Sequence, residues 1–152
     1  MPATANHSKP VRLAAAALDA ALARQWPRAE RALQRLNAEC DSEGLATALI
    51  GWCDTLIVHT TGGDTGSQTV RMAAWNVDTG VIDGEIRPTV RWAMELIQAR
   101  AAKDLDAFQA KLDELNAIDD GFERGKYAVE LLQSVALTIS STPRGYARMG
   151  QR

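Results

Sequence analysis

Apolar residues recur every three or four positions along most of this 152-residue chain, and this spacing constrains the fold more than any other feature of the sequence. Such spacing puts side chains on one face of an α-helix, whereas alternation by two would predict strands. Six stretches show it, separated by prolines, glycines or aspartates. We therefore predict a mainly all-α protein with about six helices and a single domain over residues 10–140.

Helix boundaries follow from residues that favour or forbid a helical backbone. Proline is tolerated in the first turn of a helix but costs about 3 kcal/mol inside one, and aspartate caps the free amides at a helix start. The predicted helices begin at about residues 10, 27, 43, 88, 105 and 121, and the third and sixth end near residues 59 and 140. The predicted N-caps are Asp41 or Ser42, Asp104, and Asp119 or Asp120.

The apolar positions also predict which helix faces are buried. The third helix is apolar on several faces, which predicts a central and largely buried position. The faces predicted to point inward in the first and fifth helices are Val11, Ala15, Leu18 and Leu22, and Leu105, Phe108, Leu112 and Leu115.

The two halves of the chain align at a constant shift of 79 residues. Residues 36–38 and 115–117 then share the sequence Leu-Asn-Ala, and Asp41 falls on Asp120. This predicts two similar three-helix units, residues 10–59 and 88–140, each of which covers apolar surface of the other. Chance matching of leucine-rich and alanine-rich helices is the alternative.

The connecting segment, residues 60–87, is rich in glycine and breaks the helical spacing. An Asp-Thr-Gly turn between short apolar runs predicts a β-hairpin over residues 69–82. Asp-Thr-Gly occurs at residues 64–66 and again at 78–80, and aspartic proteases use such triplets to pair two carboxylates. Those triplets need two β-lobes that this chain has too little sequence to form, so turns are the preferred interpretation. An enzyme or ligand-binding site centred on residues 60–85 is a lesser hypothesis.

Few side chains are suited to catalysis or to metal binding. The chain has two histidines and two cysteines, and a helical spacing puts Cys53 and His59 on different faces. We therefore predict a protein that is not an enzyme and holds no metal or cofactor. Both cysteines fall in apolar helical patterns and no apolar run could span a membrane, so we expect a cytoplasmic protein. A small-residue pattern at 21–23 is like a signal cleavage site and is the one counter-signal. Asp19 interrupts the run before it, and that run is mostly alanine, which is a weak hydrophobic signal, so secretion is the lesser alternative.

Four arginines recur at helical spacing along the second predicted helix and the residues just before it. We name this set the arginine ridge, and it consists of Arg24, Arg28, Arg31 and Arg35. The spacing i, i+4, i+7, i+11 puts these side chains along one side of a helix, where a solvated flank is one interpretation and where Glu39 could pair with Arg35. The other interpretation is a docking surface, and we predict that the ridge binds a partner together with Trp75 and Trp92. Packing over the helices is the alternative for both tryptophans.

Residues 22–33 resemble the turn region of tetratricopeptide-like helical-hairpin repeats. Trp26 is followed by Ala29 three residues later and by Leu33 a turn further on, and residues 102–108 are a looser match. The glycine before the turn and the closing proline of that family are missing. The resemblance implies binding of a peptide or protein on a concave helical surface. The alanine-rich and arginine-rich composition also resembles that of proteins from high-GC bacteria or their phages.

These features predict a non-enzymatic helical adaptor that binds a protein partner or itself as a homodimer. The alternative is an accessory nucleic-acid-binding protein that uses the arginine ridge and basic tails, including residues 141–152. The formal net charge of −2 is far from the strongly cationic balance of a nucleic-acid coat protein, so this alternative ranks second. Residues 1–9 and 141–152 are predicted to be flexible.

Overall fold

The computed structural model describes residues 8–62 and 87–145, and within these ranges it contains six α-helices and no strand. The helices are α1 (Lys9–Leu22), α2 (Trp26–Glu39), α3 (Ser42–Thr61), α5 (Pro88–Ala101), α6 (Leu105–Asn116) and α7 (Gly121–Ser141). The mainly all-α fold class is thereby confirmed for the described residues. The predicted β-hairpin and the two Asp-Thr-Gly triplets lie outside them.

Each helix begins within one residue of its predicted start. α1, α2 and α5 begin with a proline in the first turn, and the other three begin with a capping aspartate. Asp41, Asp104 and Asp120 each accept a hydrogen bond from a backbone N–H in the first turn of the following helix, at 2.9, 3.0 and 2.9 Å. These bonds satisfy donors that have no partner inside the helix. α1 begins one residue earlier than predicted, at Lys9, and α7 extends to Ser141.

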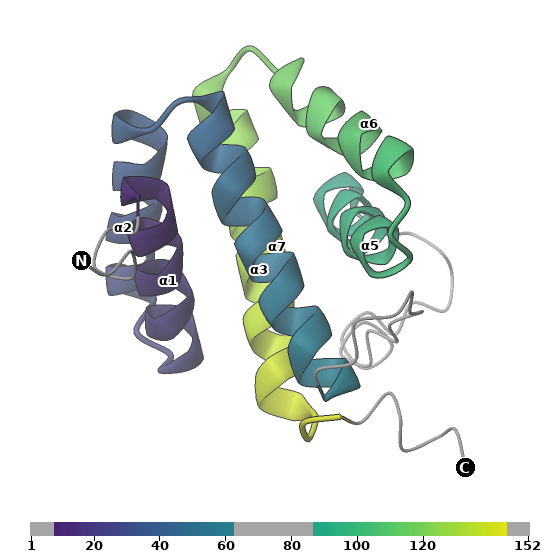
Figure 1. Ribbon diagram of the computed structural model, residues 1–152. Helices are drawn as coiled ribbons and strands as arrows, with labels where there is room; N and C mark the ends of the chain where they lie inside the picture. Colours follow the sequence, from purple (N-terminus) through teal and green to yellow (C-terminus); the bar gives the residue numbers. More distant parts are fainter. Residues whose placement is uncertain (1–7, 63–86, 146–152) are drawn as a thin grey trace, which may run out of the picture.

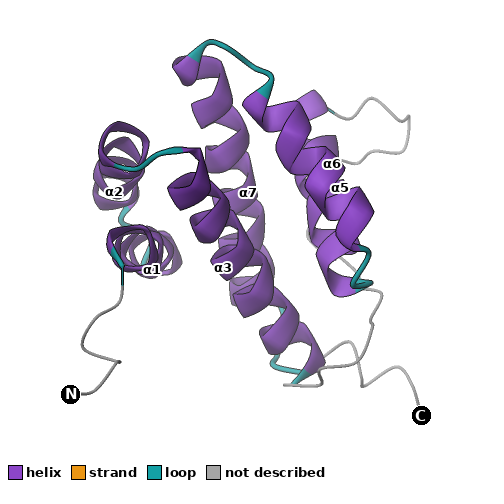
Figure 2. Ribbon diagram, turned by 45° about the horizontal axis from the view of Figure 1, so that its top comes forward, coloured by secondary structure: helices purple, strands orange, loops and turns teal. Residues whose placement is uncertain are grey.

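Helices α3 and α7 lie side by side at the centre of the molecule (Figure 1). α1 packs against both of them and is itself covered by α2. On the other side, α5 packs against α7 and α3, and α6 packs against α5 (Figure 2). α2 and α6 are therefore the outermost helices, on opposite sides of the central pair.

Two buried tryptophans each join two helices of the bundle. Trp52, in α3, donates a hydrogen bond from Nε1 to the carbonyl oxygen of Ala14 in α1, at 2.9 Å. Trp92, in α5, donates from Nε1 to the carbonyl oxygen of Lys111 in α6 at 3.0 Å, and its ring meets that of Tyr127 edge-on at 5.5 Å. An indole N–H needs such a partner when it is buried, so each tryptophan sets how two helices pack.

Two of the predicted inward faces are partly wrong. Val11 is 37% exposed and Ala15 is also exposed, because α1 carries alanine on every side and its spacing defines no unique stripe. Leu105 is 68% exposed, since it is the first residue of α6 and lies at the edge of the bundle. The face that α1 buries against α2, α3 and α7 consists of Leu13, Ala14, Ala17, Leu18, Ala20 and Ala21.

The turns after α1 and α5 share one geometry. Arg24 and Lys103 are the residues in the left-handed region, and in each turn the N–H of that residue bonds to the carbonyl three residues back. The N–H of the next residue bonds to the carbonyl five residues back. This pair of bonds ends a helix and turns the chain sharply, which lets α2 fold back on α1 and α6 fold back on α5.

Candidate partner-binding site

A groove lies between α2 and α7, with the start of α5 at one end, and has a volume of about 840 Å³. We name it the α2–α7 groove. It forms because α2 packs tightly on α1 but only loosely on α7. Its apolar lining includes Leu33, Leu36, Leu45, Phe122, Ala128 and Val129.

Phe122 is the most exposed large apolar side chain among the described residues, at 73%. It lies in the first turn of α7, beside the groove. The ammonium group of Lys126 lies 5.0 Å from the centre of its ring and also pairs with Glu123 at 3.0 Å. A single exposed apolar residue is ordinary, but an exposed aromatic ring beside an apolar groove is typical of a binding surface.

Gly125 leaves the groove open in the middle of the first half of α7. A Cβ built at this position would have no neighbouring atom within 4 Å. Glycine inside a helix costs about 0.5–1 kcal/mol relative to alanine, and no close packing requires it here. The missing side chain therefore widens the groove without any compensating contact among the described residues.

Charged side chains of both signs surround the groove. Arg87 pairs with Glu130 at 3.4 Å, and Arg124 donates to the backbone carbonyls of Ile118 and Asp119. The rim thus carries cations that are already engaged by acids or carbonyl groups. Apolar contact, rather than charge, is what this groove offers to a ligand.

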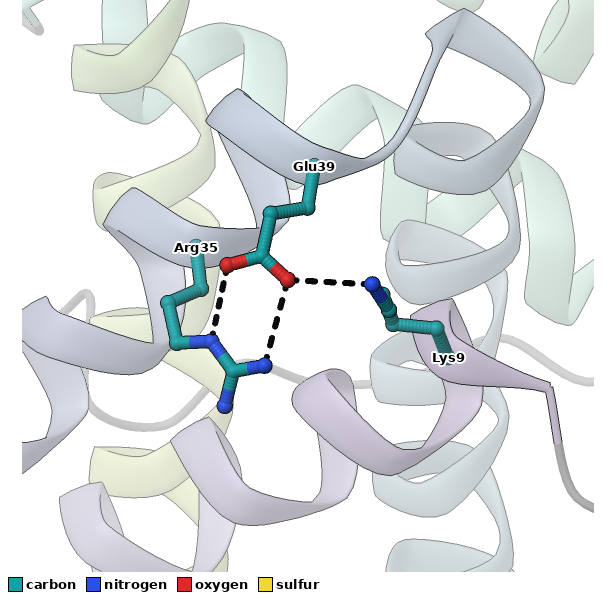
Figure 3. A network of polar contacts seen from close by, with 3 residues as sticks. All are labelled: Lys9, Arg35 and Glu39. Atoms are coloured by element: carbon teal, nitrogen blue, oxygen red, sulfur yellow. Dashed lines mark hydrogen bonds and ion pairs between the residues drawn. The ribbon is translucent and has the colours of Figure 1, made fainter.

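Three members of the arginine ridge, Arg28, Arg31 and Arg35, lie on α2. Arg24 lies in the turn before this helix, with a left-handed backbone, so the prediction of four arginines along one helix is wrong for Arg24. The last member of the ridge, Arg35, is neutralised. Arg35 donates from Nε and Nη2 to the two carboxylate oxygens of Glu39, at 2.9 and 3.1 Å, as the sequence predicted. Lys9 of α1 donates to the same carboxylate at 3.1 Å (Figure 3). The hydrogen bonds from Arg35 and then Lys9 lower the pKa of Glu39 to about 2. The cluster ties the start of α1 to the end of α2.

The other three arginines of the ridge are exposed. Arg28 donates from Nη1 to the side-chain oxygen of Gln25 at 2.7 Å, which leaves its charge uncompensated. Arg24 and Arg31 form no ion pair with any residue that the structure describes. The ridge therefore offers three cations to a partner.

One of the two tryptophans predicted to bind a partner with the ridge is buried. Trp92 is 4% exposed and belongs to the core, so we leave it out of the binding surface. Trp75 lies outside the described residues. The sequence reasoning also overlooked Phe122, whose signal was its position outside the apolar stripe that begins at Tyr127.

A second pocket, of about 630 Å³, lies between α5 and α6 and holds an ion-pair cluster. The ammonium group of Lys111 contacts the carboxylates of Glu95 and Glu114, the latter at 3.2 Å. The hydrogen bond to Glu95 raises the pKa of Lys111, which keeps the amine protonated. The raised pKa favours the protonated amine and therefore the ion pairs with both carboxylates.

Cys53, Asp54 and His59 lie in one stretch of α3, and each has another role in the structure. Cys53 is fully buried, and burial raises the pKa of its thiol, which makes it unreactive. Asp54 accepts two hydrogen bonds from Arg100, and His59 Nε2 lies 2.8 Å from the carbonyl oxygen of Thr142. Within residues 8–62 and 87–145, no three His, Cys, Asp or Glu side chains are grouped to hold a metal ion.

Comparisons with known protein families, curated proteins and solved structures found no significant match to this chain. In the described part of the chain, no helix combines the length and the apolar character needed to cross a membrane. The features that bear on function are therefore the α2–α7 groove and the arginine ridge.

Proposed function

We propose that this protein is a non-enzymatic interaction module that binds an apolar helical segment of a protein partner in the α2–α7 groove. The observation that carries the proposal is the exposed ring of Phe122 beside an apolar groove of about 840 Å³. Two helices form the walls, and a third helix that lays its apolar face between them is a recurring mode of recognition. Binding would bury the ring of Phe122 and the open space over Gly125.

The proposal includes two similar three-helix units, residues 10–59 and 88–140. Support comes from the helix starts at Lys9 and Pro88, at Trp26 and Leu105, and at Ser42 and Gly121, each pair of which is 79 residues apart. The left-handed turn residues and the capping aspartates repeat at the same distance. Paired helical hairpins of this kind offer extended surfaces for proteins, as the resemblance to tetratricopeptide-like repeats implies. A cytoplasmic location is part of the proposal, because Cys40 and Cys53 are both free thiols.

Site-directed photo-crosslinking tests the groove. A photoreactive amino acid at Phe122 or at Gln133, both of which line the groove, should capture the same partner from native lysate. The same amino acid at Gln109, exposed on α6, should not capture it. Filling the groove with Gly125→Leu should abolish capture at both groove positions.

Gly51→Leu is the matched control for this experiment. Gly51 is also a helical glycine with no atom within 4 Å of a built Cβ, but it lies on the exposed face of α3, outside the groove. Capture that survives Gly125→Leu, or that is equally strong from Gln109, would rule the groove out. Capture lost with both leucine variants would indicate a general effect on the fold and would also count against a groove-specific partner.

A second candidate function is accessory nucleic-acid binding by the arginine ridge and basic tails. The observation that favours it is the exposure of Arg24, Arg28 and Arg31 without an acidic partner among the described residues. Three phosphate contacts would weaken duplex binding roughly 40-fold between about 50 and 200 mM salt. A fluorescence-anisotropy titration would contradict this function if Arg28→Ala/Arg31→Ala bound as tightly as the wild type.

A further inference from the structure

The two outermost helices carry opposite charge. The window 24–40, which includes α2, has four arginines and two glutamates, and the window 103–119, which includes α6, has five acidic residues and two lysines. The two windows are equivalent under the 79-residue shift. α2 and α6 lie on opposite sides of the α3–α7 pair, so the molecule is basic at one edge and acidic at the other (Figure 1).

The outward face of α6 carries two aspartates, which lie in one stripe with two alanines. The stripe follows the spacing i, i+4, i+7, i+11, which keeps its members on one side of the helix, and all four members are exposed. Neither aspartate of the stripe forms an ion pair among the described residues, although Asp113 accepts a hydrogen bond from Gln109 at 2.9 Å. We name it the acidic stripe, and it consists of Asp106, Ala110, Asp113 and Ala117.

The arginine ridge has a spacing that fits this stripe. Along α2, Arg28, Arg31 and Arg35 are separated by three and then four residues. Along α6 in the opposite direction, Asp113, Ala110 and Asp106 are separated by three and then four residues as well. An antiparallel approach would therefore set two arginines opposite two aspartates over about 10 Å of helix, with the small Ala110 leaving room for the arginine between them.

We propose that the arginine ridge of one copy docks on the acidic stripe of a second copy of this chain. The charges and spacing of the two faces are complementary, and complementary charge steers association and sets its orientation. Because the two faces are different surfaces on opposite edges, each contact leaves one ridge and one stripe free. Such a head-to-tail contact builds a growing chain or a ring instead of a closed dimer. In this register Arg28 faces Asp113 and has no competing acid among the described residues, whereas Arg35 faces Asp106 while it also bonds to Glu39.

Sedimentation velocity of the nuclease-treated full-length protein tests this proposal. At about 50 mM salt the weight-average sedimentation coefficient should rise with protein concentration and pass the value of a dimer. Salt screens exposed charges, so the apparent association constant should fall about tenfold or more at roughly 300 mM. A protein that stays monomeric at low salt, or that stops at a dimer, would overturn the proposal.

Charge exchange identifies the two faces. Arg28→Glu/Arg31→Glu should be monomeric, and so should Ala110→Arg/Asp113→Arg, which places its two arginines opposite the two new glutamates and leaves the first turn of α6 unchanged. An equimolar mixture of the two variants should associate again, because the acidic α2 of one variant meets the basic α6 of the other. Circular dichroism should show that each variant keeps its helical content, and recovery on mixing requires both to be folded.

The control Arg91→Glu/Arg144→Glu makes the same change in net charge as Arg28→Glu/Arg31→Glu, but at exposed positions outside α2 and α6, and it should associate as the wild type does. Failure of the two exchange variants to recover on mixing would overturn the proposal, as would association lost on nuclease treatment, which would assign the ridge to nucleic acid. Phe122→Ala should leave self-association unchanged, so this result is independent of the groove.

Discussion

Arg24 and Lys103 adopt the same left-handed backbone conformation, with φ of 61° and 60°, in the turns that end α1 and α5. Glycine is the usual residue at this position of a helix end, because it has no Cβ to clash with the neighbouring carbonyl. A residue with a side chain pays about 1–2 kcal/mol for this conformation. Each turn therefore keeps its backbone hydrogen bonds but has a strained backbone at this one residue.

Replacing either residue by glycine should stabilise the protein. We expect Arg24→Gly and Lys103→Gly each to raise the free energy of unfolding by about 1 kcal/mol, a gain reduced by the greater flexibility of glycine in the unfolded chain. Urea denaturation measures the change. Gly62 has φ of 74°, so Gly62→Ala should lower the urea midpoint. If Arg24→Gly and Lys103→Gly both destabilised the protein, the strain assigned to the two turns would be contradicted.

The Lys9–Glu39–Arg35 cluster should make stability depend on pH in the acid range. The pKa of Glu39 is lowered from 4.5 to about 2 in the folded protein, chiefly by its hydrogen bonds with Arg35. A carboxylate with a lowered pKa stabilises the fold above its unfolded pKa, and this contribution is lost as the pH falls from about 4.5 to about 2. The melting temperatures of the wild type and Glu39→Gln should differ at pH 7 and converge near pH 2.

The difference in melting temperature between the wild type and Glu39→Gln should also shrink in high salt at pH 7, because the Lys9–Glu39–Arg35 cluster is exposed and salt screens its charges. A gap between wild type and Glu39→Gln that stays constant from pH 7 to pH 2 would show that the carboxylate charge contributes nothing.

Thr138 should tolerate, and gain from, the loss of its hydroxyl group. Its side chain is fully buried in α7, and its Oγ1 has no hydrogen-bond partner in the described structure. A buried hydroxyl without a partner costs about 1–3 kcal/mol, and valine has nearly the same shape. We expect Thr138→Val to raise the free energy of unfolding by about 1 kcal/mol. Thr60 is equally buried but donates to the carbonyl of Ile57 at 3.1 Å, so Thr60→Val should give no such gain in the same chemical denaturation assay.

The ion pair between Asp54 and Arg100 joins α3 to α5 and should be worth little. Arg100 donates from Nε and Nη2 to the two carboxylate oxygens at 2.8 and 3.1 Å, and its guanidinium group also lies over the ring of Phe108. The Asp54 side chain is 48% exposed, and exposed pairs contribute about 0.2–1 kcal/mol. A double-mutant cycle with Asp54→Ala and Arg100→Ala should give a coupling energy in that range, and a much larger value would show that solvent screens this pair less than its exposure implies.

Helix starts could be predicted from the sequence because they depend on local chemistry. Asp104 bonds to an amide three residues away, and Pro88 restricts only its own turn. Burial of α1 could not be predicted in the same way. Alanine gives an apolar side chain on every face, so only the contacts with α2, α3 and α7 decide that Ala14 is buried while Ala15 is exposed.

The candidate site was even less accessible to sequence reasoning. The α2–α7 groove brings Leu33 near Val129, and nothing in either stretch specifies how closely the two helices approach. Most of the arginine ridge was visible because Arg28, Arg31 and Arg35 lie on one helix. That only three of its arginines are available became clear from the structure, in which Glu39 pairs with Arg35. The i, i+4 spacing of these two residues was already a signal of the pair.

The small-residue face of α1 has a consequence for how this protein tolerates mutation. Ala17 has no exposed surface and lies where α1 meets its neighbours, so there is no room for added atoms. Enlarging a side chain in a packed core typically costs about 1–3 kcal/mol. A saturation-mutagenesis scan should therefore find its sharpest intolerance at some of the lightest residues of the chain, where a methyl group more, rather than a methyl group less, separates the helices.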